Sequence, residues 1–100
     1  MKRQYKVFIS QPMKDKTEET IRKERAMLVA EIESRGDIVI DSVFPNFEPK
    51  GNIPLQYLAK SLDLLAQADV AIFMQGFENA RGCKIEHDAC IAYGIATEYR

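Results

Sequence analysis

The sequence contains no tryptophan, one histidine, two cysteines and no long hydrophobic run. A membrane-spanning helix needs about 20 consecutive apolar residues, and no stretch of the chain approaches that length. Met1 to Gln4 lead into a short strand-like segment and not into the apolar core of a signal peptide. We therefore expect no membrane partner and a cytoplasmic location.

An excess of one charge is also missing. Fourteen Lys and Arg residues stand against fifteen Asp and Glu residues, which gives a net charge of −1. Binding to a run of nucleic-acid phosphates needs a basic excess, so extended nucleic acid is not an expected partner, whereas a single phosphate is compatible with this charge. The 46% hydrophobic and 29% charged content of 100 residues is typical of one globular domain, and we expect residues 1–100 to form it.

The two cysteines, Cys83 and Cys90, cannot form a disulfide with each other if both lie on the helix expected below. A helix rises about 1.5 Å per residue, which places their Cα atoms about 10 Å apart. Two free thiols fit a reducing compartment. His87 shares their helix face, but ligands so far apart along one helix cannot all reach one zinc ion. We predict no metal site and no cofactor.

Short apolar runs alternate with longer amphipathic stretches, which is the pattern of βαβ units around a parallel sheet. We expect strands at residues 5–10, 37–42 and 69–74, and a short fourth strand at 95–99. We expect helices from Asp15 or Thr17 to Arg35, from Pro54 to about Ala68, and from about Arg81 to Tyr93, with a loop over 43–53.

These elements predict an α/β fold. Parallel crossovers are almost always right-handed, so we expect a flavodoxin-like three-layer sandwich with a small parallel sheet of three or four strands in the order 2-1-3-4. Ligands of such sheets bind beyond the carboxyl ends of the strands at the switch point, here between the first and third strands. The loops that can reach this crevice are residues 10–13, 41–44 and 75–79.

Glu86 stands out on the third predicted helix. At about 100° per residue it falls inside an apolar arc that we expect to pack against the sheet. That arc contains Ile85, Ala89, Cys90, Ala92 and Tyr93. A carboxylate in such a place either braces local structure or serves as a nucleophile or acid–base group. Its place early in the helix favours the second interpretation, ranked above a Cys83–His87 nucleophilic pair, and we expect the positive helix end to keep it ionised.

Three other polar residues each have two interpretations. Asp69 opens the third strand and is either a site residue or a turn residue that accepts local backbone N–H groups. Asp41 ends the second strand and either reaches the crevice or caps the following loop. Arg25 lies near the apolar face of the first helix, where it either points to an anion or, as we favour, snorkels over the core.

Two segments carry a resemblance to a known family. Residues 6–25 (KVFISQPMKDKTEETIRKER) and 61–95 (SLDLLAQADVAIFMQGFENARGCKIEHDACIAYGI) resemble the small bacterial and phage proteins of the nucleoside 2-deoxyribosyltransferase-like superfamily. The strand end ISQPM and the block GxENARGCxxEH are specific in combination. The resemblance implies a flavodoxin-like fold and a catalytic role for Glu86, which would attack C1′ of a deoxyribose as the base leaves. A second base or water would then resolve the glycosyl-enzyme.

The resemblance also implies the remaining site residues. Asp69 matches a substrate-site aspartate and would join Glu86 in catalysis. One wall of the substrate pocket matches Ser10, Gln11, Pro12 and Met13, and the other matches Gly76, Asn79 and Gly82. Ala80 stands where the transferases have an acidic residue and the nucleotide hydrolases a phosphate-binding serine, so Asn79 or Arg81 would have to substitute. Asp15 stands where relatives more often have glycine.

We therefore expect cleavage or transfer of an N-glycosidic bond in a nucleoside, deoxynucleoside or nucleoside 5′-monophosphate. The alternative is a non-catalytic module that binds a nucleotide without turnover, or a scaffold whose site has decayed, because Ala80 departs from the family pattern. Relatives close their crevice with a neighbouring subunit, and 100 residues leave little chain to do so. We expect a homodimer or larger homo-oligomer in which the second helix and residues 44–53 complete the pocket.

Overall fold

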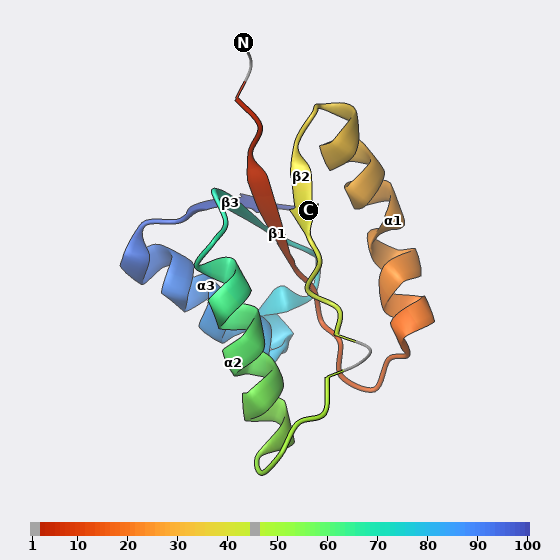
Figure 1. Ribbon diagram of the computed structural model, residues 1–100, viewed down its shortest axis with the longest axis vertical. Coiled ribbons are helices and arrows are strands. Elements are labelled where there is room, and N and C mark those ends of the chain that lie inside the picture. The colour runs from red at the N-terminus through yellow and green to blue at the C-terminus, as the bar shows by residue number, and fades with distance from the viewer. Residues whose placement is uncertain (1–2, 45–46) are drawn as a thin grey trace.

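The computed structural model describes residues 3–44 and 47–100 of the chain (Figure 1). Its elements are β1 (Lys6–Ser10), α1 (Glu18–Ser34), β2 (Ile38–Ile40), α2 (Ile53–Leu65), β3 (Val70–Phe73), the 3-10 turn η1 (Phe77–Asn79), α3 (Arg81–Tyr93) and β4 (Ala96–Tyr99). The strands form one parallel sheet in the order β2-β1-β3-β4. The predicted α/β class and strand order are confirmed.

The sheet lies between two helical layers. Figure 1 shows α1 on one side of the strands and α2 with α3 on the other. Ile9 of β1 packs in the cluster that contains Leu28 of α1. Phe8, its neighbour in the strand, packs in the opposite cluster with Leu65 of α2 and Cys90 of α3. This alternation decides which helix each residue at the end of β1 can reach.

Capping residues mark the ends of the helices. Thr17 Oγ1 accepts a hydrogen bond from Thr20 N at 3.1 Å, so Thr17 and not Asp15 caps α1. Asn52 caps α2 in the same way, and Pro54 occupies the first turn as predicted. Gly94 ends α3 with a φ of 73°.

Strands β2 and β3 are shorter than the predicted 37–42 and 69–74. Asp37 and Asp69 precede the two strands, and their carboxylates accept backbone N–H groups of Tyr5 and Lys6 at 3.0 and 2.8 Å. Asp41 follows β2 and accepts from Val43 N at 3.0 Å. At these boundaries, aspartate side chains therefore accept hydrogen bonds from backbone N–H groups that would pair with a neighbouring strand if the strands were longer.

The buried face of α3 differs from the predicted arc. Cys83, Glu86 and Cys90 are its buried residues, whereas Ile85 and Tyr93 are 39% and 85% exposed. Hydrophobic periodicity predicts that the large apolar side chains of this helix contact the sheet, but α3 meets the sheet through its small cysteine side chains. Glu86 is nevertheless on the packed face, as expected.

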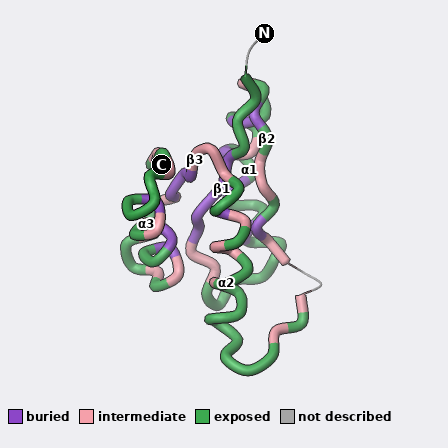
Figure 2. The backbone as a smooth tube through the Cα atoms, turned by 60° about the vertical axis from the view of Figure 1, so that its left-hand side comes forward, coloured by how far each residue is buried: buried purple, intermediate pink, exposed green. Residues whose placement is uncertain are grey.

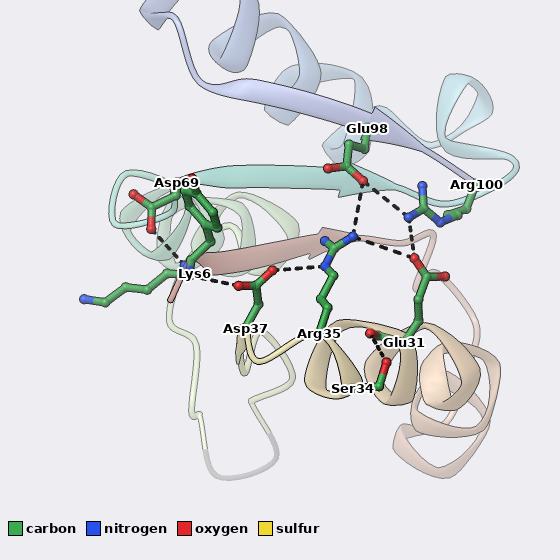
Figure 3. Close-up of polar contacts among 9 residues, drawn as sticks. Lys6, Glu31, Ser34, Arg35, Asp37, Asp69, Glu98 and Arg100 are labelled. Carbon is green, nitrogen blue, oxygen red and sulfur yellow. Dashed lines mark hydrogen bonds and ion pairs between the residues drawn. The ribbon is translucent and has the colours of Figure 1, made fainter. Parts of the chain in front are cut away.

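A charged cluster ties the end of the chain to α1 (Figure 3). Arg100 Nη2 donates to Glu31 of α1 at 2.6 Å and to Glu98 of β4 at 3.3 Å. Arg35 donates to Asp37 at 3.0 Å beside it. These exposed and half-buried pairs connect α1 and the residues after it to β4.

Buried residues concentrate in the central strands β1 and β3, and α2 is exposed over most of its length (Figure 2). Ile53 and Leu55 of α2 are 53% and 58% exposed. Across residues 3–44 and 47–100, no helix combines the length and apolar character that crossing a membrane requires.

Candidate functional site

Glu86 of α3 lies against the carboxyl end of β1. Ser10, the last residue of β1, donates a hydrogen bond from Oγ to Glu86 Oε1 at 2.7 Å. Both side chains are buried, with 1% and 7% of their surface exposed. Ser10 faces α3 because it alternates with Ile9 and shares the side of Phe8. Two segments predicted to border the crevice are thus joined directly.

Burial raises the pKa of the Glu86 carboxyl to about 7, although the hydrogen bond from Ser10 lowers it. The expectation that the positive end of α3 keeps Glu86 ionised is therefore wrong. The field of a helix end acts within the first turn, and Glu86 lies beyond the first turn of α3. Removal from water is the larger effect, so the carboxyl group titrates near neutral pH.

Cys83 and Cys90 lie one turn before and after Glu86 on the same buried face. Burial raises the pKa of both thiols to about 11, so neither is a thiolate at neutral pH. His87 Nε2 is hydrogen-bonded to Tyr99 Oη at 2.6 Å. Because Tyr99 belongs to β4, the imidazole ring of His87 points toward that strand. In the part of the chain that the structure describes, no group of three or more His, Cys, Asp or Glu residues is placed to hold a metal ion.

Gln11 follows Ser10 and turns to the opposite face, toward α1. Its Nε2 donates to Ile21 O at 3.0 Å and to Glu24 Oε1 at 3.3 Å. Its Oε1 accepts from Arg25 Nε at 2.8 Å, and Arg25 Nη2 donates to Ser42 Oγ at 3.3 Å. The carboxamide predicted to bind substrate is thus engaged inside the fold at three of its four hydrogen-bonding positions.

Arg25 is 3% exposed, so the favoured expectation that it snorkels over the core is wrong. Burial lowers the pKa of its guanidinium, and the charge of Asp41 opposes this shift. The guanidinium stays charged, as arginine does in proteins, and joins the residues that follow β1 and β2. Local sequence patterns do not indicate this network, because Gln11 and Ser42 lie 14 and 17 positions from Arg25.

A cleft of about 360 Å³ opens at the carboxyl ends of β1 and β3, on the side of α1. Its lining residues are Gln11, Pro12, Lys16, Glu24, Met74 and Gln75. Lys16 Nζ donates to both oxygens of Glu24, at 3.0 and 3.2 Å. The predicted loops contain Gln11, Pro12 and Gln75, but Lys16 and Glu24 were missed because their approach depends on the path of α1.

The structure does not bring Asp69 together with Glu86. Asp69 precedes β3 and accepts from Lys6 N at 2.8 Å, at the amino end of the sheet (Figure 3). It also accepts from Arg3 Nη2 at 2.9 Å. Glu86 contacts Ser10 at the carboxyl end. The length of β1 separates the two carboxylates, and the contacts of Asp69 are those of the turn residue considered as its alternative role.

The second predicted wall meets the first at Gly76. Gly76 has a φ of 93°, and a Cβ built there would lie 3.7 Å from Pro12 Cγ. Asn79 and Arg81 are exposed beside it. A Cβ on Gly82 would lie 3.9 Å from Leu58 of α2, an ordinary van der Waals contact, so α3 passes close to α2 here but the space would accept a methyl group.

Three positions singled out in the sequence have distinct surroundings. Met13 is half-buried in the loop after β1. Asp15 has a φ of 63°, a left-handed conformation that glycine adopts without strain. This backbone conformation fits the glycine that the family resemblance places more often at this position. Ala80 is the N-cap of α3 and provides no side-chain hydrogen bond.

The family described as "Domain of unknown function (DUF4406)" matches residues 5–99. Comparison with curated proteins and with solved structures gave no match. The matched range contains every strand and helix described above, together with Ser10, Glu86 and the cleft.

Proposed function

We propose a function for this chain, which belongs to the family described as Domain of unknown function (DUF4406). The function is cleavage or transfer of the N-glycosidic bond of a deoxynucleoside or nucleoside 5′-monophosphate, with Glu86 as the nucleophile. The observation that carries the proposal is the buried Ser10–Glu86 hydrogen bond at the carboxyl end of a parallel sheet, where ligands of such folds bind. The resemblance of residues 61–95 to nucleoside 2-deoxyribosyltransferase-like proteins supports the same glutamate.

The chemistry follows the retaining scheme for glycosidic bonds. A carboxylate oxygen of Glu86 bonds to C1′ of the sugar, and the C1′–N bond breaks with its electron pair going to the base. The base takes a proton from water, and the resulting hydroxide attacks C1′ and releases the sugar from Glu86. When a nitrogen of a second base attacks C1′ instead, its N–H proton goes to the hydroxide, the bond from C1′ to Glu86 breaks, and the outcome is transfer.

The environment of Glu86 suits a nucleophile that is active only when ionised. With a pKa near 7, the carboxyl group is divided between its two forms at neutral pH, and its ionised form is a stronger nucleophile than an ordinary carboxylate of lower pKa. Ser10 stabilises the ionised form by donating to it. Activity should therefore rise with pH through the pKa of Glu86.

A non-catalytic nucleotide-binding module is the second candidate. Ala80 favours it, because this residue offers no side-chain hydrogen bond where relatives have an acidic residue or a serine. The small exposed fraction of Glu86 is also compatible with binding without attack. Tight binding of a nucleotide without product would distinguish the module from the enzyme.

We also propose that the working unit is a homodimer or larger homo-oligomer. Large apolar side chains remain exposed on both helices of one face, including Ile53 and Leu55 of α2 and Ile85 and Tyr93 of α3. A second copy that covered them would remove this surface from water and close the crevice on the α2 side.

The test is release of free base from a panel of deoxynucleosides and their 5′-phosphates, followed by chromatography. The wild-type protein should release base from at least one member, and Glu86→Gln should release none. Glu78→Gln, an exposed change in η1, is the matched control and should keep the activity. If wild type and Glu86→Gln release base equally, Glu86 is not the nucleophile.

The same panel of substrates tests whether Arg81 binds the 5′-phosphate. If Arg81 is the anchor that replaces the missing serine, 5′-phosphates should be better substrates than nucleosides, and Arg81→Ala should abolish the difference. Equal use of both by the wild-type protein would reject this role of Arg81.

A further inference from the structure

At the carboxyl end of β1, two consecutive side chains point to opposite faces of the sheet. Ser10 reaches α3 through Glu86, and Gln11 reaches α1 through Glu24 and Arg25. The cleft lies on the Gln11 side, because Lys16 and Glu24 line it and Met74 packs against the α1-side core. The proposed nucleophile and the cleft are therefore separated by the edge of the sheet.

We infer that the ligand straddles this edge, with its base in the α1-side cleft and its sugar over Ser10 and Glu86, and that the Lys16–Glu24 pair selects a base with an exocyclic amino group. This inference rests on the proposed function, because it assigns the parts of the same substrate to the two sides of one strand end. The bond to be broken would lie above the ends of β1 and β3.

The cleft fits a flat heterocycle. Its volume, about 360 Å³, lies near the lower end of the range for small-molecule sites, about 300–1,000 Å³. Pro12 and Met74 provide apolar surface for the faces of a ring. Lys16, Glu24 and Gln75 provide polar groups for its edges, which is the combination that orients a small ligand in a concave site.

Glu24 is held as an acceptor. Lys16 donates to both of its oxygens and Gln11 donates to one of them, and the Lys16 hydrogen bond lowers the pKa of this carboxyl group. A carboxylate accepts from the amino group of cytosine or adenine, and an ammonium donates to an unprotonated ring nitrogen beside it. Thymine and hypoxanthine have a carbonyl oxygen in place of the amino group. This oxygen is a hydrogen-bond acceptor, as the carboxylate is, so the two groups cannot form a hydrogen bond with each other.

The experiment compares deoxyadenosine with deoxyinosine as substrates, and measures binding of free adenine by calorimetry. Glu24→Gln and Lys16→Met are the test variants, and Glu19→Gln and Lys23→Met, exposed changes on α1, are their controls. We expect the wild-type protein to prefer deoxyadenosine, and Glu24→Gln to raise its KM at least about tenfold, the effect of one charge-assisted hydrogen bond, with kcat changed less than about twofold. Lys16→Met should weaken adenine binding to a similar extent.

The outcomes separate this inference from the proposed function. If no substrate is turned over but adenine binds and Glu24→Gln weakens its binding, the cleft assignment holds and the proposed function fails. If base is released but both test variants match their controls in KM and in base preference, the inference is overturned and the proposed function stands. Absence of both turnover and adenine binding rejects both.

Discussion

Ser10 and Glu86 lie 76 positions apart in the sequence, and a 2.7 Å hydrogen bond from Ser10 Oγ to Glu86 Oε1 joins them in the interior. This contact links the carboxyl end of β1 to the second turn of α3, the two segments that border the sheet's switch point. A carboxyl group whose pKa is raised to about 7 by burial costs stability when it ionises, and a carboxyl group with such a pKa is typical of functional sites.

Replacing Glu86 by glutamine should stabilise the protein at alkaline pH. The folded-state pKa of about 7 is above the ordinary value of 4.5, so ionisation destabilises the folded state as pH rises from about 4.5 to about 7. Above pH 7 the cost amounts to about 3 kcal/mol. Urea unfolding at pH 5 and pH 8 should show Glu86→Gln more stable than wild type at pH 8 and closer to it at pH 5. A wild-type protein that is the more stable at pH 8 would contradict this account.

Removal of the Ser10 hydroxyl should raise the pKa of Glu86 further, because its hydrogen bond favours the ionised carboxylate. In Ser10→Ala, the rise of kcat/KM with pH should move above the midpoint near 7 expected for wild type. Carbon NMR titration of the Glu86 carboxyl carbon follows the same shift without reference to activity. An unchanged midpoint in both measurements would show that the hydroxyl does not tune this carboxyl group.

Truncation of Arg25 should destabilise the fold strongly. Arg25→Ala leaves Gln11 Oε1 without its 2.8 Å donor and Ser42 Oγ without its 3.3 Å donor, and also leaves a cavity. We expect a loss of about 2–4 kcal/mol in the free energy of unfolding. Arg22→Ala removes a half-exposed arginine of the same helix and should cost less than about 1 kcal/mol. Equal losses for the two variants would argue against the buried network.

An assembly through α2 and α3 should depend on exposed apolar residues of these helices. Leu55 is 58% exposed on α2, and Met27 is 88% exposed on α1. Light scattering should report a dimer or larger species for wild type and for Met27→Glu, and a monomer for Leu55→Glu. A wild-type monomer, or an assembly broken by Met27→Glu and not by Leu55→Glu, would contradict the proposed interface.

Much of the fold was predictable because local signals agree with the tertiary structure. Apolar runs mark the strands, Thr17 and Asn52 cap helices, and Gly94 ends α3. The packed face of α3 was less predictable, because the small cysteines and not the large apolar residues meet the sheet.

The site was predictable where it depends on strand ends and less so where it depends on helix placement. Alternation along β1 explains why Ser10 faces α3 and Gln11 faces α1. The Lys16–Glu24 pair and the burial of Arg25 depend on where α1 crosses the sheet edge, which hydrophobic periodicity alone does not determine. The position of Asp69 depends on chain direction: it precedes β3, and the crevice lies at the other end of the parallel strands.

The most direct test is detection of a covalent sugar on Glu86. The protein is mixed with the deoxynucleoside from which it releases base, quenched in acid at short times, digested and analysed by mass spectrometry. We predict a peptide carrying one deoxyribosyl group on Glu86, absent from Glu86→Gln and present in Glu78→Gln. Release of base without any adduct on Glu86, at a rate unchanged in Glu86→Gln, would contradict the assignment of Glu86 as the nucleophile.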